Sequence, residues 1–518
     1  MPRNHKYAIC EPRFQKKCVE DHFFDRSRQK TGKSMKIAQL TSIFGSLVAI
    51  LIIRFVHSNV ESERKDTSKK SETQHKRFLQ QSGVSFESIL PELGALSPAN
   101  ASSKVVEKMT EVLRKRITDM FSKATSSMCR EKIANHFSLF VNTIGNETIS
   151  GTPFSHFHLP NSCPEHTSLQ RKTKADWNRE ISKSWQPPRE EAEYIDNYKD
   201  LILLYGILMH GNVDGTLRLI QSLDQNDEYK NKTLFVVHVD GKEESDEAYL
   251  HLLHFAKSRE NVHVVPNKHR VRVNWGGFSM VNATLQILKY SFGLINNENQ
   301  ENEKDTQLPL FFHKFVHISG SHYPIKSNSE IRQRISEYPI EANFMQIVMK
   351  PNMPSLSEWH YFVECDDAVH RIHRLPSLTY KNNGVQLYTG SQWFIISKDF
   401  AEYIAREIDA VSEFIEYFTH VVVADEHFFS TVLRNSPYCT KHVNRNFNYF
   451  QFGRWESEVN PDERDQRKCL FPDPDRCGRS PTKIAIDDFF ALELSDDLFA
   501  RKVRCSPFHN IHGKNVVV

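Results

Sequence analysis

From Leu201 onward, short apolar runs alternate with amphipathic segments, and this alternation leaves few folds open to the chain. Four runs have the length and composition of buried strands: LILLYGILM (201–209), LFVVHVD (234–240), VHVV (262–265) and part of FFHKFVHISG (311–320). Between them, apolar residues recur at helical spacing, through Leu217, Ile220 and Leu223 and around Ala248–Phe255. Strand–helix–strand alternation at this spacing predicts an α/β domain with a mostly parallel sheet.

A second feature lies near the N-terminus, where residues 37–53 (IAQLTSIFGSLVAILII) contain no charged side chain. A helix of this length spans about 26 Å, which suits the thinner membranes of the early secretory pathway. Residues 1–36 hold ten Lys/Arg against four acids, so the positive-inside bias places them in the cytosol. We therefore expect a single-pass signal-anchor over residues 37–56 with the rest of the chain in the lumen. A cleaved signal peptide is the alternative, but the basic region is long and no small-residue cleavage site follows.

Composition and charge narrow the class of protein. Apolar residues make up 39% and charged residues 25%, so the chain can build a core and is not disordered throughout. The formal net charge of the chain is +3. Residues 1–36 carry a net charge of +6, so the other residues carry a net charge of −3. A basic excess confined to a short tail does not predict nucleic-acid binding. The sequence also lacks GxGxxG, P-loop, GxSxG and HExxH motifs.

Cysteines and glycosylation signals agree with a lumenal body. Seven cysteines follow the uncharged stretch, and an oxidising lumen would pair most of them and leave at least one unpaired. Four Asn-x-Ser/Thr sequons begin at Asn100, Asn146, Asn231 and Asn282. Asn282 falls within an apolar-periodic helix, so we do not expect it to be glycosylated.

The sequence divides the lumenal part into a stem and a main folded domain. Residues 58–77 have Val60 as their only apolar aliphatic residue and predict a flexible stalk. Apolar residues at helical spacing between Val105 and Phe121 predict a stem helix, which could self-associate or pack on the chain's own domain. We expect a lumenal stem and connector over 57–198 and the main domain over 199–518.

Ligands of parallel α/β sheets bind at the carboxyl ends of the strands, so Leu208–His210 and Asp240 lie where a nucleoside could dock. Asp473-Pro474-Asp475 has the form of a metal motif, but it sits in a proline-rich segment between two cysteines and is interpreted as a turn. Spacing among the 25 histidines does not predict a metal site.

Seven short motifs then occur in one order: Leu208-Met209-His210-Gly211, His238-Val239-Asp240, Trp275-Gly276-Gly277, Tyr323-Pro324-Ile325, Gly390-Ser391-Gln392-Trp393, Glu426-His427-Phe428-Phe429 and Phe499-Ala500-Arg501-Lys502. Together, over about residues 201–505, they resemble glycosyltransferase family 14, the core-2/I-branching β-1,6-N-acetylglucosaminyltransferases and peptide O-xylosyltransferases. The resemblance implies a GT-A-type nucleotide-sugar-binding domain, and type II proteins of the Golgi (or ER) membrane.

Within that family the chain is most similar to the xylosyltransferases, through Trp-Gly-Gly, the FFSTVLRNSPYC stretch and Cys477-Gly478-Arg479-Ser480-Pro481. It departs from them in two ways that bear on donor and acceptor identity. His322 stands where the family usually has an acid before Tyr/Phe-Pro-Ile, and Gln392 stands where the xylosyltransferases have an acid before tryptophan. Arg467 and Arg479 also replace two family cysteines.

The resemblance assigns roles to particular residues. Glu426 matches the catalytic base, and Arg501 with Lys502 matches the basic pair that binds the diphosphate in place of a metal. The positions that match donor contacts are Leu208, Asp240, Val273, Asn274, Trp275, Gln392, Trp393 and Ser480. No metal or other cofactor is expected, and the donor is a UDP-sugar. Without the resemblance, each of these residues has a simpler explanation. Glu426 could be a surface acid, and Arg501 and Lys502 could form a solvated patch with Arg504. Trp275 and Trp393 could be core aromatics.

The resemblance also implies disulfides. Cys469 should pair with Cys477, and Cys439 should bridge back to the connector, with Cys163 the best candidate. The expected function is an inverting UDP-sugar-dependent transferase, most similar to xylosyltransferases, acting on a glycoprotein, proteoglycan-type peptide or glycan. Alternatives within the family are an N-acetylglucosaminyl- or glucuronosyltransferase. An alternative of another class is a catalytically silent carbohydrate-binding or scaffold protein, which the His322 and Gln392 departures favour slightly.

Overall fold

The computed structural model describes residues 121–133, 135–136, 161–164, 184–225, 227–295, 309–348, 360–374, 385–452, 481, 484, 488–503, 508–509 and 515–516. Within these residues, no helix is both long enough and apolar enough to cross a bilayer. The expected anchor over 37–56, the stalk and the stem helix before residue 121 lie outside the described residues.

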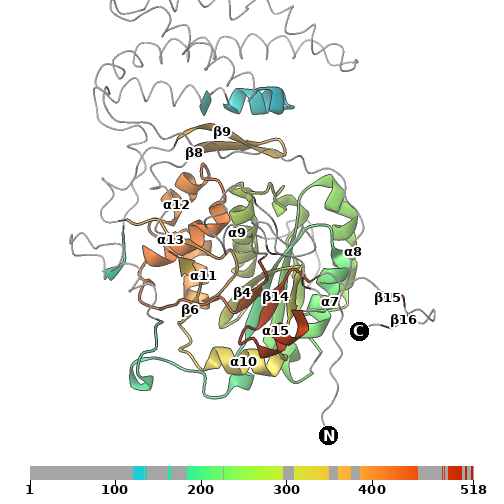
Figure 1. Ribbon diagram of the computed structural model, residues 1–518, viewed down its shortest axis with the longest axis vertical. Helices are drawn as coiled ribbons and strands as arrows, with labels where there is room; N and C mark the ends of the chain where they lie inside the picture. The colour runs from blue at the N-terminus through green and yellow to red at the C-terminus, as the bar shows by residue number, and fades with distance from the viewer. Residues whose placement is uncertain are drawn as a thin grey trace, which may run out of the picture.

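The body of the molecule is built on a seven-stranded sheet in the order β12–β6–β11–β4–β1–β2–β3 (Figure 1). Its strands are β1 (Leu203–Met209), β2 (Thr233–Val239), β3 (Val262–Val264), β4 (Lys314–Ser319), β6 (Asn343–Phe344), β11 (Phe394–Ser397) and β12 (His442–Val443). β11 is antiparallel to both of its neighbours, and all other pairs are parallel. The prediction of an α/β domain with a mostly parallel sheet is therefore confirmed, and the four predicted runs supply β1 to β4.

The central strands β1 and β2 contain no charged residue, and both of their faces are covered. Along β1, Leu203, Tyr205 and Ile207 enter one core, while Leu204 enters the other. Gly206 sits among them because a Cβ at this position would overlap the ring of Phe315 on β4. Strands buried on both faces need continuous apolar runs, as the sequence indicates.

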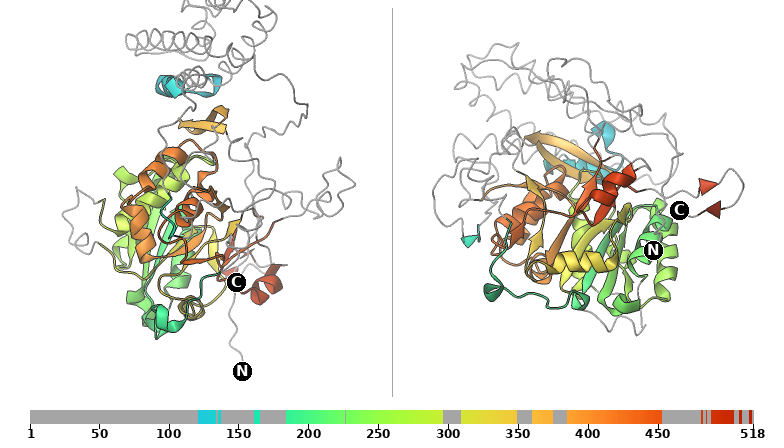
Figure 2. Two further views of the ribbon diagram at one scale, coloured as in Figure 1. Left: turned by 90° about the vertical axis from the view of Figure 1, so that its left-hand side faces the viewer. Right: turned by 60° about the horizontal axis from the view of Figure 1, so that its bottom comes forward.

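Helices cover the two faces of this sheet. One face carries α7 (Val213–Leu223), α8 (Asp246–Lys257) and α10 (Asn328–Ser336). The other carries α9 (Ser279–Ser291), α11 (Lys398–Ala405), α12 (Val411–Phe418) and α13 (Phe428–Arg434). Figure 2 (right) shows the green helices α7 and α8 and the orange helices α12 and α13 on opposite sides of the strands. Asn282 lies within α9, as its apolar-periodic surroundings predict.

A second, three-stranded sheet in the order β13–β14–β5 brings the C-terminal part of the chain back to the body. It consists of β5 (His322–Pro324), β13 (Asn448–Phe450) and β14 (Phe499–Arg501). The other described elements are the pairs β7 (Ile347–Val348) with β10 (Thr389–Gly390), β8 (His360–Cys365) with β9 (Ala368–Arg374), and β15 (Phe508–His509) with β16 (Asn515–Val516), the helix α15 (Phe489–Leu494), and short 3-10 turns. Because β5 follows directly after β4, the small sheet stands at the carboxyl edge of the main sheet.

Among the described residues, two disulfides tie segments that precede the domain to its body. Cys163 and Cys439, the pair that the family resemblance suggests, are joined with a Cα–Cα distance of 5.7 Å. Cys129 is joined to Cys365 at the end of β8, with a Cα–Cα distance of 5.3 Å, a bridge that the sequence did not predict. The Asp366 carboxylate, next to Cys365, accepts hydrogen bonds from the backbone N–H and hydroxyl groups of Thr125 and Ser126. The segment around Cys129 is therefore held by hydrogen bonds as well as covalently.

Replacing both Cys129 and Cys365 with serine should lower the free energy of unfolding by about 2–5 kcal/mol, because the bridge closes a loop of 236 residues. Denaturant unfolding of the double variant beside the wild type measures this loss. Peptide mapping without reductant should recover the two cysteines in one linked peptide. Alkylation of Cys129 in the unreduced protein would contradict the bridge.

Candidate active site

Asp240 anchors the candidate site at the carboxyl edge of the sheet, directly after β2. Its backbone N–H donates to the carbonyl of Met209 at the end of β1. Its side-chain Oδ1 accepts hydrogen bonds from the backbone N–H groups of Lys242 and Val273, both at 3.1 Å. The carboxylate therefore fixes the loop that carries Val273 against the ends of the two central strands.

The other carboxylate oxygen of Asp240 faces His210, whose Nδ1 lies 3.2 Å from Oδ2. Burial by itself raises the pKa of Asp240, but the hydrogen bonds from His210, Val273 and Lys242 outweigh it and lower the pKa below its ordinary value. The same contact raises the pKa of His210, although partial burial opposes the rise. The pair places a fixed negative charge under an exposed imidazole at the end of β1.

The loop after β3 approaches this edge closely. The backbone N–H of Val271 donates to Nε2 of His238, and Gly241 N–H donates to the Val271 carbonyl. A Cβ at Gly241 would lie 3.0 Å from the backbone of this loop, so only glycine fits here without a shift. Burial lowers the pKa of His238 to about 4, so it is neutral and can accept this hydrogen bond.

Glu364 of β8 supports the next part of the loop. Its Oε1 accepts from the side-chain amide of Asn274 at 3.0 Å, and its Oε2 accepts from the backbone N–H of Ser279, the first residue of α9. A Cβ at Gly277 would overlap the Glu364 carboxylate, which explains the second glycine of Trp-Gly-Gly. Asn274 is thus a buried support of the loop, whereas the neighbouring Trp275 is 79% exposed and free to meet a ligand.

A backbone hydrogen bond joins this loop to the turn that holds Glu426. The carbonyl of Gly276 accepts from the N–H of Val423 at 2.8 Å, and Val423 O accepts from Glu426 N–H at 3.1 Å. Val423 has a φ of 56°, a left-handed conformation that is rare for a β-branched residue. Strained residues of this kind cluster at functional sites, where the surroundings hold them in place.

Two acids stand side by side on this turn (Ala424–Glu426), and their environments differ. Glu426 is exposed, whereas Asp425 is buried, with its Oδ1 lacking a hydrogen-bond partner among the described residues. Burial, with the charge of Glu426 beside it, raises the pKa of Asp425 to about 7. Adjacent carboxyl groups held in such different surroundings are typical of sites that move protons.

The small sheet brings Arg501 to the same place. β14 pairs with β5 so that Arg501 lies opposite His322, and its guanidinium stands 4.8 Å from the centre of the Trp393 ring. His322 contacts the same ring edge-on at 4.6 Å between ring centres. Burial lowers the pKa of Arg501 to about 10, against the opposing effect of Asp425, so the guanidinium remains charged at neutral pH.

His322 is neutral beside this cation. Burial lowers its pKa well below the ordinary value, and the charge of Arg501 lowers it further. Its Nδ1 lies 2.9 Å from both the backbone nitrogen and the hydroxyl of Ser319. The family usually has an acid at this position. In this chain the ring is neutral, so it does not neutralise the charge of Arg501.

The structure brings most of the sequence-derived candidates into one chain of contacts. Asp240 joins the Val273–Trp275 loop, that loop joins the Glu426 turn, Asp425 interacts electrostatically with Arg501, and Arg501 rests on Trp393. Leu208 is tied in through its carbonyl, which accepts from Gly320 N–H, and Gln392 through its carbonyl, which lies 2.9 Å from Nδ1 of His317. Lys502 follows Arg501 at the end of β14, and its carbonyl accepts from Ile484 N–H.

Several candidates lie outside the described residues: Cys469, Asp473, Asp475, Cys477, Ser480 and Arg504. Two residues of the site, Asp425 and Glu364, were not found from the sequence. Asp425 adjoins the family glutamate and could have been noticed for that reason, but nothing in the local sequence indicates its burial. Cys129, Cys365 and His370 lie together as possible metal ligands among the described residues, but the two sulfurs are bonded to each other and the group has no free thiolate pair.

The raised pKa of Asp425 predicts a pH-dependent stability. In the unfolded chain Asp425 loses its proton near pH 3.8, whereas in the folded chain it keeps the proton up to about pH 7. The contribution of Asp425 to the free energy of unfolding therefore falls as the pH rises from about 4 to about 7 and then levels off. Asp425→Asn cannot ionise, and its stability relative to wild type should be higher at pH 8 than at pH 4 by a few kcal/mol. Thermal unfolding at both pH values measures this difference. Asp214→Asn, at an exposed position of α7, is the control, and an equal shift in both variants would contradict the assignment.

Comparison with known proteins gives a consistent set of matches. A family model, "Branch: Core-2/I-Branching enzyme", matches residues 212–471, about half of the chain. Xylosyltransferase 2 of Mus musculus is 25% identical over 403 residues, which cover 76% of this chain and 40% of that protein. Xylosyltransferase 1 of Rattus norvegicus is 24% identical over 433 residues, covering 81% and 45%. The chain thus matches less than half the length of these relatives.

Among solved structures, the apo structure of the WbbM bifunctional glycosyltransferase aligns over 67% of this chain and 54% of that chain. Its sequence identity is 11% and its TM-score is 0.25.

Proposed function

Because the chain belongs to the core-2/I-branching enzyme family, we propose that it is an inverting glycosyltransferase that uses a UDP-sugar donor. The observation that carries this proposal is the meeting of Glu426, Asp425 and Arg501 at the carboxyl edge of the sheet. A proton acceptor and a fixed cation are the two groups that sugar transfer to a hydroxyl requires.

In the proposed reaction Glu426 takes the proton of the acceptor hydroxyl as its oxygen attacks the anomeric carbon of the donor. The bond between that carbon and the diphosphate breaks, and both of its electrons leave with UDP. Arg501, with Lys502 next to it, offsets the charge that develops on the diphosphate. Fixed guanidinium and ammonium groups can supply this electrostatic stabilisation, so the proposed mechanism needs no metal.

The remaining residues of the site would position the donor. Asp240, Leu208 and the Val273–Trp275 loop stand where the carboxyl ends of β1 and β2 meet, the usual place for a nucleoside in a parallel sheet. Trp275 offers an exposed aromatic face. Trp393 lies against Arg501 and would therefore, with the adjacent Gln392, face the sugar and diphosphate rather than the nucleobase.

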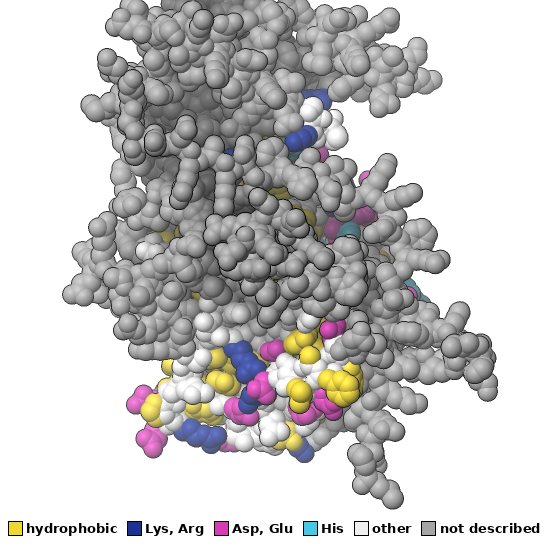
Figure 3. All heavy atoms as spheres, viewed as in Figure 1, with side chains coloured by type: hydrophobic (Ala, Val, Ile, Leu, Met, Phe, Trp, Pro, Cys, Tyr) yellow, Lys and Arg dark blue, Asp and Glu magenta, His cyan; other side chains and the backbone are white. Residues whose placement is uncertain are grey.

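The curated relatives named above are xylosyltransferases, which makes UDP-xylose the first donor to test. UDP-N-acetylglucosamine and UDP-glucuronate remain alternatives within the family, because Gln392 replaces an acid of the xylosyltransferases and His322 replaces one that the family usually has. The acceptor would be a hydroxyl of a glycoprotein, proteoglycan-type peptide or glycan in the secretory lumen, with residues 37–56 as the membrane anchor. The coloured part of the face in Figure 3 mixes acidic and basic side chains.

A catalytically silent carbohydrate-binding protein is the second candidate, and the same two replacements favour it. Loss of two acids from the site would be compatible with binding a sugar nucleotide without transferring it. The neutral state of His322 argues in the other direction, since it leaves Arg501 with its charge available for a diphosphate.

Hydrolysis of UDP-sugars by the purified protein separates these candidates. We expect UDP release from one donor of a panel of UDP-xylose, UDP-N-acetylglucosamine and UDP-glucuronate, and the same rate in EDTA. Binding of a UDP-sugar without release of UDP would support the silent protein. Loss of hydrolysis in chelator, restored by Mn²⁺, would show that the metal-free mechanism is wrong.

A further inference from the structure

A histidine stands beside the Cys129–Cys365 bridge and takes no part in the proposed chemistry. Nε2 of His370 lies 3.6 Å from Sγ of Cys129, and the ligand atoms of all three residues lie within 4.8 Å of one another. Cys129 and His370 are buried, and Cys365 is partly buried. Cysteine sulfur and imidazole nitrogen are the ligands that zinc prefers in proteins.

The hairpin of β8 and β9 brings Cys365 and His370 to the same side. Cys365 pairs with Ala368, and His370 pairs with Val363, across the two strands. Because side chains alternate between the faces of a strand, Val363 and Cys365 share one face, and His370 faces the same way as its partner Val363. The register of the hairpin therefore places the histidine beside the cysteine.

Hydrogen bonds hold Cys129 against this hairpin independently of the bridge. Figure 1 shows the segment that carries Cys129, in cyan, beside β8 and β9. The Asp366 carboxylate accepts from the Ser126 hydroxyl at 2.6 Å, and the Ser126 oxygen accepts from the backbone N–H of Cys129 at 3.0 Å. Nζ of Lys132 donates to the carbonyl of Glu364 at 3.0 Å. Opening the bridge would therefore leave the two sulfurs within reach of one ion.

The separation of the ligand atoms fits a tetrahedral zinc ion. Zinc–sulfur distances of about 2.3 Å and zinc–nitrogen distances of about 2.0–2.1 Å, at a tetrahedral angle, place a sulfur and a nitrogen about 3.6 Å apart. Sγ of Cys129 and Nε2 of His370 already have this separation. The Asp366 carboxylate is engaged by Thr125 and Ser126, so a water molecule would take the fourth position.

A hollow gives access to the bridge from solvent. It has a volume of about 250 Å³, and Cys365 lines it together with Lys132, Arg272 and Thr419. This volume is ample for a hydrated metal ion or for one small thiol. The bridge is thus reachable by both the reductant and the ion.

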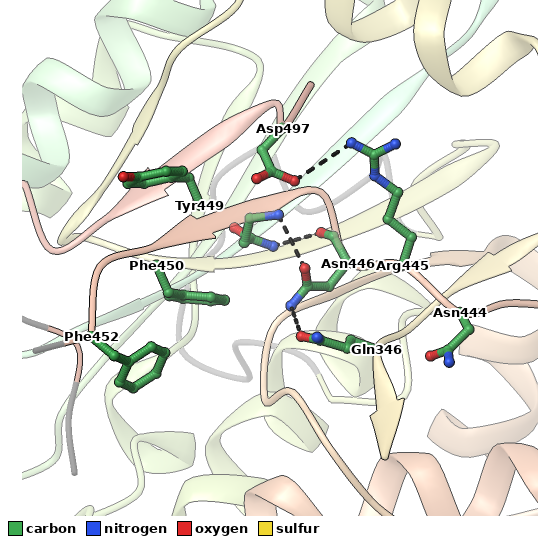
Figure 4. Close-up of a pocket in the computed structure, with 9 residues that line it drawn as sticks. Gln346, Asn444, Arg445, Asn446, Tyr449, Phe450, Phe452 and Asp497 are labelled. Atoms are coloured by element: carbon green, nitrogen blue, oxygen red, sulfur yellow. Dashed lines mark hydrogen bonds and ion pairs between the residues drawn. The ribbon is translucent and has the colours of Figure 1, made fainter. Parts of the chain in front are cut away.

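The combination of sulfur and imidazole distinguishes this hollow from a larger one beside β13. Figure 4 shows the larger hollow, of about 390 Å³, with side-chain amides and aromatic rings around it and the ion pair of Arg445 with Asp497. The described residues that line it include neither cysteine nor histidine. Ligands suited to zinc are therefore a feature of the hollow at Cys365.

We propose that Cys129, Cys365 and His370 form a zinc site when the bridge is reduced, so that the ion and the disulfide are interchangeable cross-links. Two molecules of a low-molecular-weight thiol supply two electrons and two protons to the bridge, and they leave joined as their own disulfide. Zn²⁺ then displaces the two protons from the cysteine sulfurs and binds Nε2 of His370. Exchange with an oxidised thiol runs the sequence in reverse and releases the ion.

The exchange would preserve the support of the candidate donor loop. Glu364, next to Cys365, accepts hydrogen bonds from the Asn274 amide and from the N–H of Ser279 at the start of α9. A zinc ion would keep the end of β8 attached to the segment of Cys129, as the bridge does. The zinc site lies outside the proposed reaction, so it does not depend on the proposed function and is compatible with metal-free transfer.

Zinc titration of the full-length protein tests the site. The protein is first reduced with tris(2-carboxyethyl)phosphine, whose phosphorus takes up an oxygen atom from water and leaves no added thiol in solution. In competition with a chromophoric chelator, reduced His370→Ala should bind zinc at least roughly tenfold more weakly than reduced wild type. Before reduction the two proteins should not differ, and His370→Ala keeps the bridge while it folds. His251→Ala, at an exposed position of α8, is the control and should match wild type.

Alkylation with iodoacetamide, followed by peptide mapping, locates the ion. Zinc should protect Cys129 and Cys365 in reduced wild type but not in reduced His370→Ala, and it should raise the unfolding temperature of reduced wild type alone. Equal zinc affinity in the two reduced proteins, or alkylation of both cysteines at the same rate with and without zinc, would overturn the inference. A reduced wild type that unfolds and that zinc does not restore would overturn it too.

Discussion

Replacing Glu426 with glutamine is expected to reduce turnover by roughly 10²–10⁴-fold and to leave UDP-sugar binding nearly unchanged. The amide keeps the shape of the side chain and its hydrogen-bonding capacity, but it cannot accept the proton of the acceptor hydroxyl. Glu426 is exposed on its turn, so the substitution should not affect folding. Initial rates at saturating donor, together with UDP affinity from calorimetry, measure the two effects separately.

Glu416→Gln is the matched control, because Glu416 is an exposed glutamate at the end of α12 outside the candidate site. It should retain full turnover. Wild-type turnover in Glu426→Gln would instead direct attention to Asp425, the buried neighbour whose pKa of about 7 would suit a base near neutral pH.

Arg501→Ala should weaken both UDP binding and turnover, with turnover falling by roughly 10²–10³-fold. The diphosphate carries charge before and during bond cleavage, so the loss of this cation affects the ground state as well as the transition state. A second consequence concerns Asp425, whose pKa the charge of Arg501 holds down. In the alanine variant that pKa should rise further, which a shift in the pH dependence of stability would report.

Arg501→Lys keeps a positive charge and should recover part of the UDP affinity, though not the planar contact with Trp393. Arg334→Ala, on the outer surface of α10, is the control for loss of an arginine elsewhere. If Arg501→Ala loses turnover but binds UDP as tightly as wild type, the diphosphate does not bind at Arg501.

The strands and helices of the first half of the domain were predictable because each has a local signature. β1 and β2 are buried on both faces and appear as unbroken apolar runs, and α7 places Leu219, Ile220 and Leu223 in one core. The antiparallel strand β11 was not predicted. Its four residues, FIIS, form a short apolar run that does not indicate the orientation of the strand. The orientation follows from the antiparallel pairing with β4.

The candidate site depends on contacts between distant segments, which local patterns do not report. The pairing of β14 with β5 sets Arg501 beside His322, and only the assembled sheet shows it. Burial of Asp425 likewise depends on the packing around its turn. The family motifs indicate which residues to consider, but the contacts of each residue follow from the fold.

The two disulfides also decide what becomes of the chain after proteolysis. If the protein is anchored as proposed, a single cut between the membrane and Cys129 would release the whole catalytic body into the lumen. A cut between Cys129 and Cys163 would not separate the pieces, because each cysteine remains bonded to the body, at Cys365 and Cys439. A fragment that begins at residue 199 would lack Cys129 and Cys163, so the thiols of Cys365 and Cys439 would lose their disulfide partners. A cut before Cys129 would therefore leave the disulfide-bonded body whole, whereas a cut between Cys129 and Cys163 would leave two pieces joined by the Cys129–Cys365 bridge.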